Sequence, residues 1–236
     1  MKRLFTIAIC IITAMTVISC SSDKRKKALL PNISGHAGEV VVVVDKGDWE
    51  GAVGTTLRDT LAQDCPFLPQ REPLYTLVNV IPSGFTNMFQ IHRNIIIVNI
   101  KNDILNPGVK LRYDIWAKPQ CVISIDARSS SEAVDLIKEN SRLLITALEQ
   151  AERDRLIANH KRYEERKLSQ VVTKMVGGSP HFPSGWKLKK ETEDFIWISY
   201  DIQYLTQGVL IYKYPVVPGE NMLSLESLLA EHSKML

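Results

Sequence analysis

The chain has 236 residues, of which 45% are hydrophobic and 23% charged, and its formal net charge is +3. A chain of this length and apolar content can bury a core, as one domain or two small ones, so a disordered protein is excluded. Without Lys2, Arg3 and Asp23–Lys27, 23 basic and 25 acidic residues remain. The folded part is therefore slightly acidic, and we expect no nucleic-acid partner.

The N-terminus predicts a lipoprotein signal peptide over residues 1–19. Two basic residues precede an apolar run from Leu4 to Ile18, which is short for a permanent membrane helix. The run ends on Val17-Ile18-Ser19-Cys20, which resembles the lipobox of bacterial lipoproteins. We therefore expect lipidation of Cys20; the alternatives are a secretory signal cleaved near Ser21 or a short membrane helix.

Residues 20–34 are polar and basic and predict a lipidated tether. The expected partner is a lipid bilayer, held through the lipid on Cys20 and touched by the basic residues of the tether. Ser21 after the cysteine favours the outer membrane, and Ser22–Arg25 lacks the acidic run expected of surface-exported lipoproteins. The predicted location is the cell envelope, at the outer membrane and facing the periplasm.

Residues 35–150 predict an α/β subdomain. The β-branched run Glu39–Asp45 indicates a central strand, and Asp48 begins a helix with an apolar stripe through Trp49, Val53, Leu57 and Leu61. A β-α-β unit follows from the next strand, and the last three strands lie close enough in sequence for antiparallel pairing. The further strands are expected at Leu74–Ile81, Asn94–Ile100, Lys110–Ala117 and Cys121–Asp126, with a short helix over Phe85–Ile91.

Ser129 and Glu132 predict a capping box before a long helix. The charged stretch Glu152–Lys167 indicates a solvated helix face, or a surface that docks a partner. Residues 151–180 therefore predict a helical connector between two subdomains. Its end at Leu168–Val176 can be helix or strand.

Residues 181–236 predict a small β-rich subdomain. A turn at Pro183–Trp186 is followed by strands Phe195–Tyr200 and Val209–Tyr214, which pair across the intervening loop, and Leu225 begins a terminal helix. The abrupt end at Leu236 leaves open whether this subdomain is complete. The expected class is α+β: a mixed, mostly antiparallel sheet with packed helices, then a long helix and a small β-rich subdomain.

Two cysteines remain outside the signal peptide and the lipobox, Cys65 and Cys121. An oxidising periplasm permits a disulfide between them, and two buried free thiols are the alternative.

Several ordered landmarks resemble the DUF4837 family of predicted Bacteroidetes lipoproteins. They are the lipobox, the Gly38–Asp45 strand, Trp49 with Gly51 and Gly54, Leu68–Pro73, His92–Ile96, Pro183–Trp186, Phe195–Ile198 and Gly208–Pro215. The resemblance implies a lipoprotein and no activity, because the family is defined by sequence alone. Members of that family continue past the position of Leu236, which suggests that the chain is truncated at its C-terminus.

Polar residues near strand ends form the best catalytic candidate. Asp45, Glu72 and His92 can supply an acid-base pair for an envelope hydrolase or transferase. The structural alternative makes Arg93 and Glu72 an ion pair and Asn94 a polar cap at the start of a strand. We favour this alternative and assign no catalytic residue.

No nucleotide, metal or hydrolase motif is present, and the five histidines are scattered singly, so no cofactor is expected. Gly51 and Gly54 indicate close helix-sheet packing rather than a phosphate loop. The aromatic residues of the second half can form a sugar- or peptide-binding face or simply pack a core; they are Trp186, Trp197, Tyr200, Tyr204, Tyr212 and Tyr214. The favoured function is a non-enzymatic binding or structural module with an envelope protein or cell-wall partner.

Overall fold

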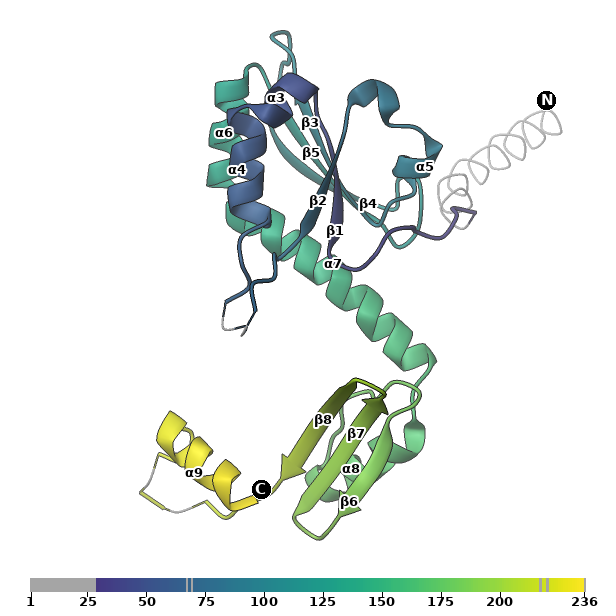
Figure 1. The fold of residues 1–236 in the computed structure, drawn as a ribbon, viewed down its shortest axis with the longest axis vertical. Helices are drawn as coiled ribbons and strands as arrows, with labels where there is room; N and C mark the ends of the chain where they lie inside the picture. The colour runs from purple at the N-terminus through teal and green to yellow at the C-terminus, as the bar shows by residue number, and fades with distance from the viewer. Residues whose placement is uncertain (1–28, 67, 69, 217, 220, 236) are drawn as a thin grey trace, which may run out of the picture. The chain divides into compact units, whose positions relative to one another are not determined.

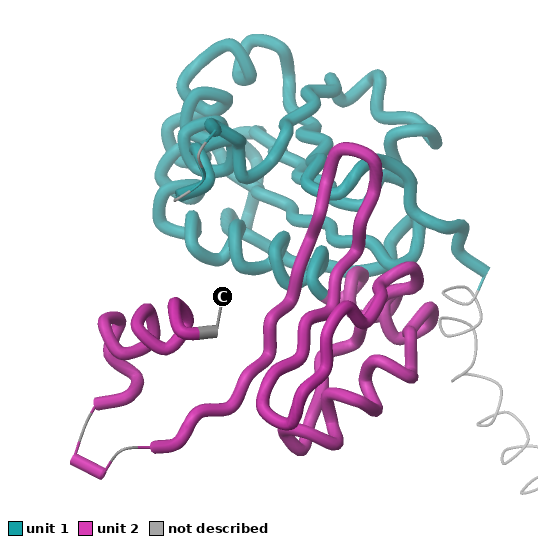
Figure 2. The backbone as a smooth tube through the Cα atoms, turned by 60° about the horizontal axis from the view of Figure 1, so that its bottom comes forward, with its two compact units in different colours: residues 1–153 teal, residues 154–236 magenta. Residues whose placement is uncertain are grey.

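The computed structural model describes residues 29–66, 68, 70–216, 218–219 and 221–235. The chain divides into two compact units, residues 1–153 and residues 154–236 (Figure 1, Figure 2). The predicted signal peptide, Cys20 and tether residues 21–28 lie outside the described part. Each unit contains one sheet, and the expected α+β class, with a small β-rich unit after a long helix, is confirmed.

The first unit is built on a five-stranded sheet with the order β2-β1-β3-β5-β4. β1 pairs in parallel with β2 and β3, and β3 pairs in parallel with β5, whereas β4 is antiparallel to β5. The sheet is mixed, but the expectation that it is mostly antiparallel is wrong. The strands are β1 (Glu39–Val43), β2 (Thr76–Val80), β3 (Asn94–Ile100), β4 (Gly108–Tyr113) and β5 (Cys121–Ala127).

Burial on both faces explains the parallel pairing. β1, β3 and β5 are runs of mainly Val and Ile that are buried along most of their length, as parallel strands covered on both faces are. β4 exposes Lys110–Tyr113 and lies at the edge. The expected antiparallel pairing is confirmed for β4 with β5, but β3 pairs in parallel with β5 rather than with β4, which follows it in the chain.

Helices cover one face of this sheet and enclose its larger core. α4 and α6 lie side by side on that face (Figure 1). Val42, Leu57, Ile137 and Leu148 are fully buried there. The helices of this layer are α3 (Lys46–Glu50), α4 (Ala52–Leu61), α6 (Ser130–Glu139) and the first part of α7 (Ser141–Arg162).

The opposite face is covered by a shorter segment between β2 and β3. It contains the 3₁₀ turn η1 (Pro82–Gly84) and α5 (Asn87–Gln90). Phe85, Phe89 and Trp116 pack over Val41 and Ile95 in a second core cluster. With both faces covered, β1 and β5 are buried at all but one of their residues, and β3 is buried over its first half.

Two predicted helices are each split by one residue. Gly51 separates α3 from α4, and a Cβ built on Gly54 would lie 1.9 Å from the backbone oxygen of Trp49. A Cβ on either glycine would thus meet the backbone of α3, so these glycines allow α4 to follow α3 closely, and the expected role in helix-sheet packing is not what they serve. Asn140 likewise separates α6 from α7. The side chain of Ser129 accepts the backbone N–H of Glu132 at 3.2 Å, which confirms the helix start.

The second unit packs one helix on a three-stranded antiparallel sheet ordered β6-β7-β8. Its elements are α8 (Arg166–Val176), β6 (Lys187–Glu191), β7 (Phe195–Ile202), β8 (Leu205–Tyr212) and α9 (Leu225–Met235). The segment that can be helix or strand is helical and ends at left-handed Gly177. It packs on Ile196 and Ile198 and so belongs to this unit rather than to a connector.

The hairpin of β7 and β8 is tighter than expected. Ile202 pairs with Leu205, so the strands occupy most of the predicted Asp201–Gly208 loop. Cys65 and Cys121 are free thiols, which removes the alternative of a disulfide. Within the described part of the chain, every helix is too short or too polar to cross a bilayer.

Candidate functional site

The structure separates the three predicted acid-base residues. Asp45 follows the carboxyl end of β1, whereas His92 precedes the amino end of β3, and these two strands are parallel. The register aligns Glu39 with the level of Arg93, so Asp45 lies roughly 20 Å further along the sheet. Glu72 is exposed, and its backbone oxygen accepts the N–H of Cys65. These residues form no common site.

His92 instead faces Glu39, the first residue of β1. Its Nε2 lies 3.4 Å from Oε2 of Glu39, and its Nδ1 lies 3.3 Å from the backbone oxygen of Asn94. Both ring nitrogens thus face oxygen atoms, and each is within reach of a polar partner. The His92 side chain is 10% exposed, and Gly35 lies against its imidazole. The imidazole is therefore largely buried, whereas the Glu39 side chain is 27% exposed.

The pKa of the Glu39 carboxyl is held below its ordinary value of 4.5. The main cause is the backbone N–H of His36, which donates to Oε2 at 2.7 Å. Burial opposes this effect, and His92 adds to it. The carboxylate is therefore stabilised in its charged form by the backbone turn that precedes β1.

We expect this carboxylate to make the first unit sensitive to acid. A lowered pKa in the folded state stabilises the fold above about pH 4.5, and this stabilisation is lost as the pH falls through the lowered pKa. Glu39→Gln should therefore flatten the fall in melting temperature between about pH 6 and about pH 3. An equal fall in melting temperature with pH in the variant and the wild type would contradict this expectation.

Arg93 and Asn94 converge on Glu152, in α7. Arg93 Nη2 donates to Glu152 Oε2 at 2.7 Å, and Asn94 Nδ2 donates to Oε1 at 2.8 Å. Asn94 also donates to the backbone oxygen of Glu39 at 3.0 Å. The predicted ion pair between Arg93 and Glu72 is wrong, and the charged stretch that begins at Glu152 is not a solvated face at that residue. We call Glu39, His92, Arg93, Asn94 and Glu152 the polar cluster.

The polar cluster fastens the segment that leads into β1 and includes its first residue, residues 31–39, which we call the strap. Ser34 N–H donates to Ile91 at 2.9 Å, and Arg93 N–H donates to Ser34 at 3.1 Å. Arg93 Nη1 reaches the backbone oxygen of Gly35, and Gly38 N–H donates to Glu152. Each group of the cluster is thus engaged in holding strap, sheet and helix together, and the chemistry of the cluster is structural.

A second titratable cluster lies at the start of α8. Ser169 Oγ donates to Glu164 Oε1 at 2.5 Å, and His181 Nδ1 lies 3.0 Å from the same oxygen. These contacts, chiefly that of Ser169, lower the pKa of Glu164. In a nucleophilic triad the histidine lies between serine and carboxylate. Here the carboxylate occupies the middle, so the serine is not activated.

The aromatic residues of the second unit do not form one face. Trp186 and Tyr200 stack at 6.2 Å on the helix side of the sheet, whereas Trp197 lies on the opposite side. Tyr212 packs with Tyr214 at 6.1 Å. Trp197 and Tyr204 are exposed, so the six residues lie in different settings and the expectation of a single aromatic binding surface is not supported.

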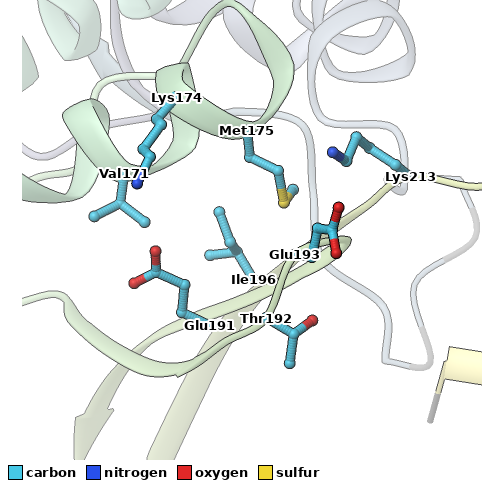
Figure 3. A pocket seen from close by; sticks show the side chains of 8 residues that line it. All are labelled: Val171, Lys174, Met175, Glu191, Thr192, Glu193, Ile196 and Lys213. Atoms are coloured by element: carbon cyan, nitrogen blue, oxygen red, sulfur yellow. The ribbon is translucent and has the colours of Figure 1, made fainter.

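The second unit contains a cleft that the sequence did not indicate. It has a volume of about 530 Å³ and lies between α8 and the turn that joins β6 to β7 (Figure 3). Its lining residues are Val171, Lys174, Met175, Glu191, Thr192, Glu193, Ile196 and Lys213. The strand β6 was not predicted, because its sequence of Lys, Leu and Glu carries little β propensity. We call this site the α8 cleft.

The comparisons with known proteins give one match, which covers the described part of the first unit from residue 34 and the α7 residues that follow it. A family model for a domain of unknown function, DUF8532, matches residues 34–161, more than half of the chain. The chain belongs to the DUF8532 family. No curated protein and no solved structure matches it. The match does not bear on the resemblance to DUF4837, which stays a prediction.

The DUF8532 region contains the whole polar cluster, whereas the α8 cleft lies outside it. In the described part of this DUF8532 member, no three His, Cys, Asp or Glu side chains are grouped to hold a metal ion.

Proposed function

We propose that this DUF8532 member is a membrane-anchored lipoprotein of the cell envelope, with a non-enzymatic binding or structural role. The observation that carries the proposal is the lipobox Val17-Ile18-Ser19-Cys20 at the end of a short apolar run. A lipidated Cys20 holds a protein at a bilayer without a spanning helix. The tether then joins the domain at the strap.

The polar cluster supports a role under tension rather than in catalysis. A load on the lipid anchor enters the domain through the strap, directly before β1, an inner strand of the sheet. At this point His92, Arg93 and Glu152 bind the strap to neighbouring elements. Of the three residues that favoured an enzyme in the sequence, His92 is thus used to secure the anchored end.

The proposed location is the outer membrane, with the domain facing the periplasm. The residues after Cys20 carry no acidic run, and the basic tether suits contact with anionic headgroups. The partner is an envelope protein or a cell-wall component. Protease treatment of intact cells should leave the domain uncut, whereas its removal would contradict the periplasmic orientation.

Replacing the proposed lipid acceptor tests the anchor directly. Cys20→Ser should abolish incorporation of labelled palmitate and move the protein from the membrane to the soluble fraction, because no thiol remains to be alkylated. Cys10→Ser, within the apolar run, is the matched control and should retain label and membrane association. Label on Cys20→Ser, or loss of label in both variants, would contradict lipidation at Cys20.

A further inference from the structure

The floor of the α8 cleft is apolar. Ile196 is buried, and Val171 and Met175 pack partly against the core of the second unit. The cleft opens where the last turns of α8 stand over the β6-β7 turn (Figure 3). A matching ligand would therefore have a hydrocarbon middle section that packs on this apolar floor.

The charges of the cleft are divided between its two ends. Lys174 and Glu191 lie at one end, Lys213 and Glu193 lie at the other, and Met175 and Ile196 lie between them (Figure 3). The strand register gives the same arrangement. Glu191 pairs with Ile196 on one side, and Ile196 pairs with Ile211 of β8 on the other, two residues before Lys213.

Each end therefore presents one ammonium and one carboxylate. Among the described residues, none of these four side chains forms an ion pair within 4.0 Å. The two ends are separated by two strand spacings, about 10 Å. A simple anion or cation would meet both attraction and repulsion at either end, so neither is the matching ligand.

We propose that the α8 cleft binds a diamino dicarboxylic acid, a molecule with two amino-acid head groups joined by a short hydrocarbon chain. Each head group carries an ammonium beside a carboxylate, which complements one Glu and one Lys at each end. The hydrocarbon chain lies on Met175 and Ile196. Such two-headed amino acids occur free and as cross-linking residues of cell-wall peptides, a chemistry consistent with the proposed envelope location.

Calorimetric titration of the purified full chain with diaminopimelic acid tests the site. We expect saturable binding with a dissociation constant at or below about 1 mM. Norleucine keeps one head group, and pimelic acid keeps both carboxylates without ammonium groups. Each should bind at least about tenfold more weakly, because charge-assisted hydrogen bonds are lost.

Variants at opposite ends of the cleft locate the binding. Glu191→Gln and Lys213→Gln should each weaken binding of diaminopimelic acid about tenfold. Lys190→Gln is the matched control, because Lys190 lies over the Phe195 ring at 5.3 Å and pairs with Trp197 on the other side of the sheet. Its affinity should equal that of the wild type.

Three results would overturn the proposal: no saturable binding, equal affinity for norleucine or pimelic acid, or unchanged affinity in both cleft variants. The ligand panel uses the wild-type chain alone and does not depend on the folding of any variant. The titration does not depend on the palmitate experiment. Each experiment can therefore contradict its own proposal, ligand binding in the cleft or lipidation of Cys20, without affecting the other.

Discussion

Glu152→Ala is expected to lower the free energy of unfolding of the first unit by about 3 kcal/mol. The carboxylate accepts hydrogen bonds from Arg93 and Asn94, and the Asn94 side chain is fully buried. The Arg93 and Glu152 side chains are 16% and 19% exposed, so water replaces the lost partner poorly. Removing one member of such a pair leaves a buried charge without its main acceptor.

Hydrogen exchange of β1 and β3 amides measures this loss within the first unit. The matched control is Glu149→Ala, one turn earlier in α7, where the carboxylate is 45% exposed and contacts Arg153 at 3.8 Å. That exposed pair should contribute less than about 0.5 kcal/mol. Equal effects of the two substitutions would mean that the polar cluster does not stabilise the strap and sheet.

Glu152 also shows what the sequence could have revealed. It continues the buried row of Leu144 and Leu148 at a spacing of four residues, so a carboxylate lies on the apolar stripe of α7. A charged residue in that position requires a partner. The surrounding charges hid this signal, because the stretch as a whole has the composition of a solvated helix.

Strand order was the main quantity that local patterns could not supply. The Val and Ile runs of β1, β3 and β5 predicted buried strands, but they do not specify which strands are neighbours. Only the parallel register of β1 and β3 brings Glu39 to His92 and separates both from Asp45. The sequence-based candidate site failed for this reason, although it contained the correct histidine.

The strands of the second unit were harder to predict because their sequences carry weak local signals. β6 is fully exposed and rich in lysine, which suits an edge strand but resembles a loop in sequence. β7 and β8 were recognised from their aromatic and β-branched residues, while the two-residue turn Gln203-Tyr204 has no Gly or Asn to mark it. The α8 cleft depends on β6 and on that sheet, and so was not predicted.

Gly35→Ala should destabilise the first unit by at least about 3 kcal/mol. A Cβ on Gly35 would lie 2.2 Å from Nε2 of His92, and its φ of +84° is already unfavourable for alanine. The added methyl must displace the imidazole from Glu39 or lift the strap from β3. Hydrogen exchange at β1 and thermal melting both report the loss.

Gly38→Ala measures the cost of a positive φ for alanine without a collision between the added Cβ and a side chain. Gly38 has nearly the same φ, +78°, but the nearest atom to its Cβ is the backbone oxygen of Leu74 at 3.9 Å. It should lose only the conformational cost, about 1 kcal/mol. The double variant Gly35→Ala/His92→Ala should lose less stability than the sum of the losses in the two single variants, because alanine at position 92 removes the collision. If the losses of stability in the single variants add up to the loss in the double variant, the Cβ at position 35 does not collide with His92, and the strap does not pack on the imidazole.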